Sequence, residues 1–91
     1  MDEHVTIYIP RNAIPVLNRK NNSVLVSVSG EQRLIYYGEA AQFKVAGKAV
    51  AEIFMGKNVK RLSEYVYPSK TYAVRFVEMI FSQIVIELVE I

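Results

Sequence analysis

The sequence has no cysteine, no tryptophan, one histidine, three prolines and four glycines. Without cysteine the chain forms no disulfide bond and no thiolate metal site, and a cysteine nucleophile is excluded. The low proline and glycine content, with 52% hydrophobic residues, excludes collagen-like and disordered classes. The 91 residues therefore predict one domain, 1–91, that folds by packing alone in a reducing cytoplasm.

A long uninterrupted hydrophobic run is also missing. The most apolar stretch, 73–91, is broken by charged and amide side chains at Arg75, Glu78, Gln83, Glu87 and Glu90. A membrane helix needs about 20 consecutive apolar residues, and the chain opens with no charged and then apolar leader. We therefore expect a soluble protein with no membrane partner.

Recognisable catalytic motifs are absent. His4 has no second histidine with which to share a metal ion, and no nucleophile elbow, phosphate-binding loop or dinucleotide fingerprint occurs. His4 is expected in a polar, flexible N-terminal tail, and Glu87 and Glu90 are expected on the solvent side of a strand, pointing to opposite faces. We expect no catalytic residue, no metal and no cofactor, although a small hydrolytic site without a motif stays open.

The charge is modest but unevenly placed. The formal net charge is +2, yet the span from Arg11 to Arg75 holds all eleven basic residues and only four acidic ones, a net charge of +7. Such asymmetry permits a polyanionic partner, and basic residues beside predicted turns suit a phosphate backbone. Tyrosines add faces on which bases can stack. The candidate RNA-binding residues are Arg11, Arg19, Lys20, Lys57, Lys60 and Arg61 for phosphates, with Tyr36 and Tyr67 for stacking.

The first third of the chain predicts three strands. The β-branched and aromatic run 5–9 predicts a strand that stops at Pro10, followed by at most one helical or 3₁₀ turn within 11–17. Serine alternates with valine through 23–29, which indicates a strand with one apolar face. The segment 33–37 is its hairpin partner, and Gly30, Glu31 and Gln32 form the expected loop.

The segment 43–55 fits two periods equally well. As a helix it places Lys44, Lys48 and Glu52 at i, i+4 spacing, whereas as a strand it gives an unbroken apolar face opposite those same three residues. Its alanines favour the helix. Beyond it, 59–66 predicts either a short helix or a mixed strand, and the runs 72–81 and 84–91 predict the closing pair of strands.

Strand-like stretches follow one another along the chain in a characteristic order: Ile9-Pro10-Arg11, Leu34-Ile35-Tyr36-Tyr37, 45–53, 72–76 and 84–88. This order resembles the PUA-like superfamily, small β-barrels that include archaeal ASCH- and EVE-type domains. The resemblance implies a mainly β (α+β) open barrel with one or two short helices, favours the strand interpretation of 43–55 and implies RNA binding. The Gly-x-Lys-x-x-Glu-x-Arg signature of many ASCH domains is absent, which leaves their nucleoside-directed activity unsupported.

Other interpretations remain open. Residues 5–11, 24–28 and 33–36 are similar to a swapped-hairpin transcription factor of the AbrB kind, which implies a DNA-binding dimer, but that domain ends near Tyr37. An Alba-like chromatin fold requires a helix over 40–55. A small ASCH-type hydrolase and a protein-interaction module that uses the strand 84–89 as an edge complete the alternatives. We expect a non-enzymatic module that binds structured or single-stranded RNA, as a monomer or homodimer.

Overall fold

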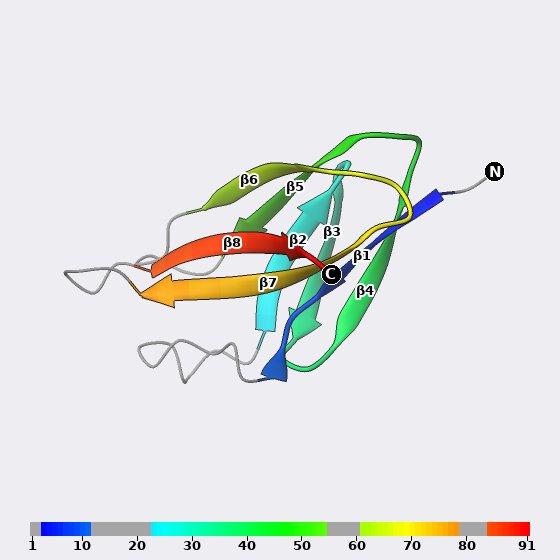
Figure 1. The fold of residues 1–91 in the computed structure, drawn as a ribbon. Coiled ribbons are helices and arrows are strands. Elements are labelled where there is room, and N and C mark those ends of the chain that lie inside the picture. Colours follow the sequence, from blue (N-terminus) through cyan, green and yellow to red (C-terminus); the bar gives the residue numbers. More distant parts are fainter. Residues whose placement is uncertain (1–2, 12–22, 55–60, 79–83) are drawn as a thin grey trace.

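Apolar residues alternate with polar ones through most of this chain, and each alternating segment forms a strand whose apolar side faces a shared core. The computed structural model describes residues 3–11, 23–54, 61–78 and 84–91, and these contain eight strands (Figure 1). The strands are β1 (Glu3–Tyr8), β2 (Ser23–Val28), β3 (Glu31–Tyr36), β4 (Ala40–Val45), β5 (Ala49–Phe54), β6 (Leu62–Val66), β7 (Thr71–Glu78) and β8 (Ile84–Glu90).

The strands form two four-stranded sheets. One sheet has the order β4-β1-β7-β8 and the other has the order β3-β2-β5-β6. All neighbouring strands are antiparallel except β1 and β7, which run parallel with Thr6 opposite Thr71. Figure 1 shows β7 and β8 in front of β2 and β3, so the sheets lie face to face. The mainly β fold class is therefore confirmed.

The core lies between the two sheets and is built from aliphatic and aromatic side chains. Edge and central strands of both sheets contribute alternate residues, as expected for a sandwich in which one face of each sheet is buried. The first sheet contributes Val5, Ile7, Ile9, Phe43, Val45, Tyr72, Val74 and Ile86. The second contributes Val24, Val26, Val28, Ile35, Ala49, Ala51, Ile53 and Val66.

The edges of the two sheets approach each other along both sides of the sandwich. Strand β3 lies near β4, and β6 lies near β8. On the first side Arg33 reaches inward from β3, and its guanidinium carbon is 5.4 Å from the centre of the Phe43 ring. On the second side the backbone N–H of Tyr67 donates to the Tyr72 hydroxyl at 2.9 Å. A guanidinium group thus covers the core on the first side, and a hydrogen bond joins the end of β6 to β7 on the second.

Within the segment 43–55, the described residues 43–54 form two strands joined by a corner, so the helical interpretation is wrong. Strand β4 ends at Val45 in one sheet, and β5 begins at Ala49 in the other. Between them Gly47 has a φ of 153°, which residues with a side chain rarely adopt. The alternation keeps its phase across the corner, because Val45 and Ala49 are both buried. Burial in the core therefore outweighs the helical preference of the alanines.

The β2–β3 hairpin has a shorter loop than the three residues expected. Val28 pairs with Glu31, so the loop consists of Ser29 and Gly30 alone and β3 starts two residues earlier than expected. Both loop residues have positive φ, 51° and 84°. Two-residue turns with positive φ at both positions have a twist that matches the twist of the paired strands. Glycine is favoured at the second position of such a turn, where Gly30 lies.

Two further expectations need correction, and two strands are confirmed. His4 lies within β1 opposite Lys44, so it is not in a flexible tail. Leu62–Val66 is a strand, which excludes a helix there, while residues 59 and 60 lie outside the described part. The closing pair is confirmed as β7 and β8, which share a ladder of seven residue pairs. Of the expected turn at 11–17, only Arg11 is described, in a 3₁₀ conformation.

Candidate nucleic-acid interface

The surface of interest is the side of the sheet β3-β2-β5-β6 that faces away from the core, called the outer face below. Strand register places Leu34 opposite Leu25 and Leu25 opposite Phe54, so three apolar side chains cross the sheet in one row. Leu34 is 60% exposed, and Leu25 and Phe54 are partly exposed. Tyr36, 48% exposed, stands two residues beyond Leu34 on the same side of β3. The outer face therefore presents a band of apolar and aromatic groups.

A guanidinium group covers the Phe54 end of this band. Arg61 precedes Leu62, which pairs with Ile53, and this brings Arg61 next to Phe54. Its guanidinium carbon lies 4.4 Å from the centre of the Phe54 ring, and the same group forms an ion pair with Glu52. The Arg61 side chain is 59% exposed. A flat cation is therefore stacked on an aromatic ring at the surface, where incoming groups can reach it.

A second cation and ring lie farther along the same two strands. Val50 pairs with Tyr65, and the Lys48 ammonium nitrogen is 3.9 Å from the centre of the Tyr65 ring. Tyr65 is 60% exposed. Because same-face residues on a strand are spaced by about 7 Å, the two ring and cation pairs are separated by about 13 Å along the strands. Two of the aromatic rings on the outer face are thus each in contact with a cation.

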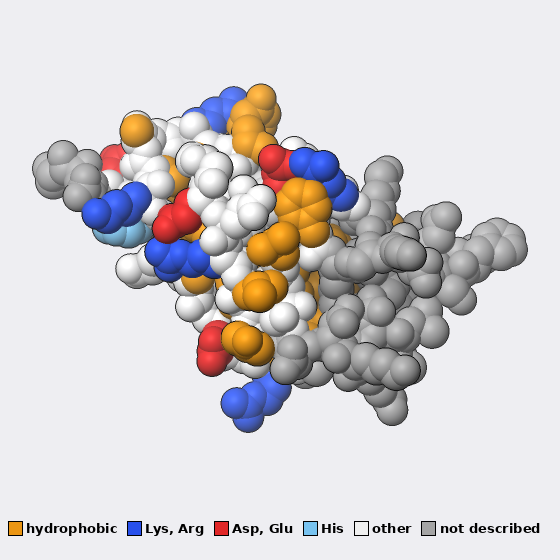
Figure 2. Space-filling view, turned by 180° about the vertical axis from the view of Figure 1, so that it is seen from behind, with side chains coloured by type: hydrophobic (Ala, Val, Ile, Leu, Met, Phe, Trp, Pro, Cys, Tyr) orange, Lys and Arg blue, Asp and Glu red, His pale blue; other side chains and the backbone are white. Residues whose placement is uncertain are grey.

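Polar side chains fill the row between these two pairs. Ser27 pairs with Gln32 on one side and with Glu52 on the other, and Glu52 pairs with Ser63. The row offers hydroxyl, amide and carboxylate groups, which donate and accept hydrogen bonds. Viewed from behind (Figure 2), hydrophobic side chains run as a band over this face, with basic and acidic side chains adjoining it. Stacking surfaces therefore alternate with hydrogen-bonding groups.

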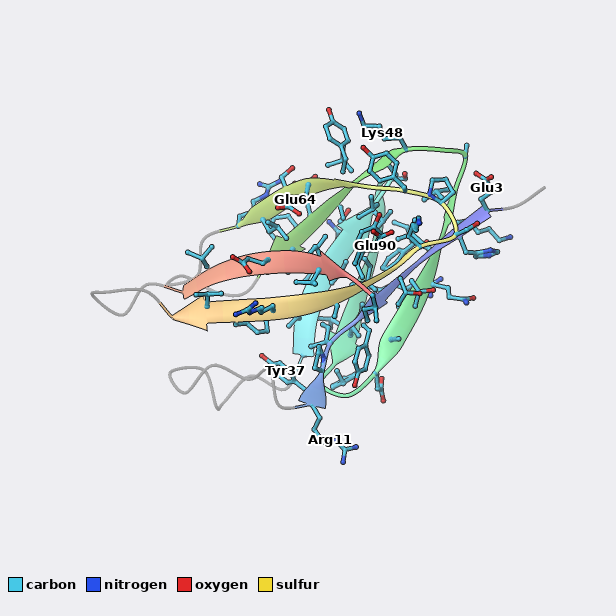
Figure 3. All side chains as sticks on the ribbon, in the orientation of Figure 1. Glu3, Arg11, Tyr37, Lys48, Glu64 and Glu90 are labelled. Atoms are coloured by element: carbon cyan, nitrogen blue, oxygen red, sulfur yellow. The ribbon has the colours of Figure 1, made fainter. Side chains whose placement is uncertain are left out.

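Three of the described residues expected to bind RNA lie at one end of the fold. Tyr36 pairs with Ser23 at the start of β2, and Arg61 adjoins Phe54 at the end of β5, which is the same end of that sheet. Arg11 follows β1, and its side chain packs beside Gly38 in the β3–β4 turn, close to Tyr36. Figure 3 shows Arg11 and Lys48 at opposite ends of the molecule.

Tyr67 is not part of that group. It follows β6, whereas Arg61 precedes β6, so six residues of nearly extended chain, about 20 Å, separate them. Tyr67 is 49% exposed and lies at the Lys48 end, since its neighbour Val66 pairs with Ala49. The remaining expected residues, Arg19, Lys20, Lys57 and Lys60, lie outside the described part of the chain.

The excess positive charge nevertheless has a defined origin in the sequence. Those four basic residues belong to the stretches 12–22 and 55–60, which contain no acidic residue. The described residues that border these stretches on the outer-face sheet are Ser23, Phe54 and Arg61. Both stretches are therefore joined to the sheet at the end where Tyr36, Phe54 and Arg61 lie.

Four residues of the candidate interface are not among those predicted from the sequence: Lys48, Glu52, Phe54 and Tyr65. The sequence pattern predicts part of this arrangement. In the segment 43–55 apolar residues occupy one side of the strand, so the other side must carry Lys48, Val50, Glu52 and Phe54. Their partners on β6 follow only from the strand register. Periodicity within one strand does not give that register.

Several other titratable groups lie away from the outer face. Within residues 3–11, 23–54, 61–78 and 84–91 no group of three histidine, aspartate or glutamate side chains is placed to hold a metal ion. Glu90 forms an ion pair with Lys70 at 3.1 Å, and Glu87, exposed as expected, stands opposite Arg75. Burial raises the pKa of Tyr37, whose ring contacts Phe76 edge-on with 6.4 Å between ring centres.

Comparisons with known proteins provide no relative. No protein-family model, curated protein or solved structure matches this chain. Among the described residues no helix has the length and apolar character required to cross a membrane.

Proposed function

We propose that this domain is a non-enzymatic module that binds single-stranded RNA, or single-stranded parts of structured RNA, on its outer face. The observation that supports this most is the pair of exposed rings, Phe54 and Tyr65, each in contact with a cation, Arg61 and Lys48. Sites for single-stranded nucleic acid combine aromatic stacking surfaces with cations that follow the backbone. The strand register of this sheet face places both at regular spacing.

The geometry favours single strands over duplexes. Stacking on Phe54, Tyr65 or Tyr36 requires bases with a free face, which a duplex does not offer. The spacing of about 13 Å between the two ring and cation pairs leaves room for a base between them, above the polar row. The stretches 12–22 and 55–60 contain four basic residues and no acidic residue, and in the sequence they adjoin Ser23, Phe54 and Arg61. We further propose a PUA-like affiliation and a cytoplasmic location for this RNA-binding domain.

The test is fluorescence anisotropy with labelled single-stranded RNA, transfer RNA and duplex DNA. Phe54→Leu and Tyr65→Leu keep an apolar side chain but remove the ring, and each is expected to weaken binding of single-stranded RNA by about 1–3 kcal/mol, the range for one stacked base. Tyr8→Leu is the matched control, since Tyr8 lies in β1 of the other sheet and is only partly exposed.

Two results would contradict the proposal. The first is the absence of RNA binding by the unmodified domain at low salt. The second is equal weakening by Tyr8→Leu and by the two outer-face variants, with circular dichroism showing all four proteins folded. A preference for duplex DNA would instead favour the AbrB-type interpretation.

A further inference from the structure

We propose that the outer face recognises guanine, using the Glu52 carboxylate and the Phe54 ring that Arg61 occupies in the free protein. This inference rests on the proposed RNA binding and adds a base preference to it. It starts from the fact that one guanidinium makes two contacts at once, over the ring of Phe54 and with the carboxylate of Glu52. Moving Arg61 away therefore exposes a stacking surface and a hydrogen-bond acceptor together.

Guanine can replace both contacts of that guanidinium. It is a flat ring system that stacks on aromatic side chains, and its N1–H and N2–H groups point from one edge as two adjacent donors, like the N–H groups of arginine. A carboxylate accepts such a pair with both oxygens. Adenine and cytosine present one amino group beside an acceptor, and uracil presents one N–H between two carbonyls. Guanine is therefore the base that matches Glu52 best.

The positions on the sheet suit this exchange. Glu52 and Phe54 are two residues apart in β5, so their side chains lie on the same side of the strand, about 7 Å from each other. A base stacked on Phe54 can therefore direct an edge toward Glu52. Ser27 and Ser63 flank Glu52 on the neighbouring strands and offer hydroxyl groups to the rest of that edge. Single-stranded RNA is read in this way, by stacking combined with hydrogen bonds to the Watson–Crick edge.

The exchange also gives Arg61 a new partner. Its ion pair with Glu52 is at the surface, with the two side chains 59% and 31% exposed, and such pairs are weak. Once guanine binds Glu52, the guanidinium is free for the adjacent phosphate, whose geometry it matches with two parallel hydrogen bonds. The carboxylate is then still paired with donors, so no uncompensated negative charge faces the RNA.

The experiment compares short oligouridylates with one central guanosine, inosine or adenosine, bound to the unmodified domain, Glu52→Gln, Arg61→Ala and Glu64→Gln. Inosine lacks only the N2 amino group. We expect the unmodified domain to prefer guanosine over inosine by about tenfold. Glu52→Gln should remove this preference, and Arg61→Ala should keep it while weakening all three oligonucleotides. Glu64→Gln, the same change at an exposed residue of β6 on the opposite side of the strand, should behave as the unmodified domain.

The outcomes separate the two proposals. Equal binding of guanosine and inosine oligonucleotides, or a preference that survives in Glu52→Gln, would overturn guanine recognition and leave RNA binding intact. Loss of the preference in Arg61→Ala would also overturn it, because Arg61 would then be the group that reads the base. Binding of none of the oligonucleotides would refute RNA binding itself, and the base preference with it.

Discussion

Replacing Lys48 and Arg61 with glutamine should make RNA binding less sensitive to salt. Each phosphate contact with a single strand contributes a slope of about −0.7 to the plot of log K against log salt. Lys48 and Arg61 are the cations in contact with the two outer-face rings, so the pair corresponds to a slope of about −1.4. Between 50 and 200 mM salt, the fourfold rise reduces affinity by about 2.6-fold per contact and about 7-fold for both.

The assay is anisotropy of single-stranded RNA measured across that salt range. Lys48→Gln should lower the ratio of affinities at the two salt concentrations by about 2.6-fold, and the double variant by about 7-fold. Lys70→Gln is the control, because Lys70 precedes β7 and is paired with Glu90 on the other sheet. The basic residues in 12–22 and 55–60 are unchanged in every variant, so their share of the slope cancels.

One result would refute this reasoning directly. If Lys70→Gln reduces the slope as much as Lys48→Gln, the effect comes from the total charge of the domain and not from cations on the outer face. A double variant that keeps the full slope would show that these two residues do not contact phosphates.

Three further predictions concern the fold. Gly30→Ala should lower the free energy of unfolding in urea by about 1–2 kcal/mol, because φ is +84° there while nothing within 4 Å would clash with the methyl group; unchanged stability would contradict the turn geometry. Phe43→Ala should cost about 3–5 kcal/mol by the same measurement, since the ring is fully buried, and a loss below about 1 kcal/mol would be inconsistent with that burial. Burial raises the pKa of Tyr37 above its usual value of 10, so the folded domain keeps a proton that the unfolded chain releases. The free energy of unfolding should therefore fall as pH rises above about 10, and it should fall less steeply in Tyr37→Phe. The same pH dependence in both proteins would show that Tyr37 is not the group responsible.

The strands that could be predicted are those whose alternation is visible within a single segment. Val24, Val26 and Val28 mark β2 by themselves, and the β-branched run 5–9 marks β1. The corner at Gly47 could not be predicted in this way, because the alternation continues through it without a break. What turns the chain there is the change of sheet, which depends on strands elsewhere in the sequence.

In the candidate site too, some features follow from single segments of the sequence and others only from strand pairing. The sequence predicts Arg11 and Arg61 as phosphate-binding residues and Tyr36 as a stacking ring, and the fold places all three at one end of the sandwich. The contact of Lys48 with Tyr65 joins residues on different strands, and it exists only because Val50 pairs with Tyr65. Composition and spacing identify which groups are available, whereas strand pairing decides which of them meet.

The parallel pairing of β1 with β7 has a consequence for how this chain folds. Thr6 pairs with Thr71, and the Thr6 N–H donates to the carbonyl oxygen of Lys70 at 3.1 Å, so the centre of one sheet joins residues far apart in sequence. Closing such a long loop precedes any gain from the contact, which makes folding slow for a domain of this size. During synthesis β1 has only one of its two partners until Thr71 has been made, and its free side is exposed to other chains in that interval. A chain truncated before β7 should therefore aggregate rather than form a smaller sandwich.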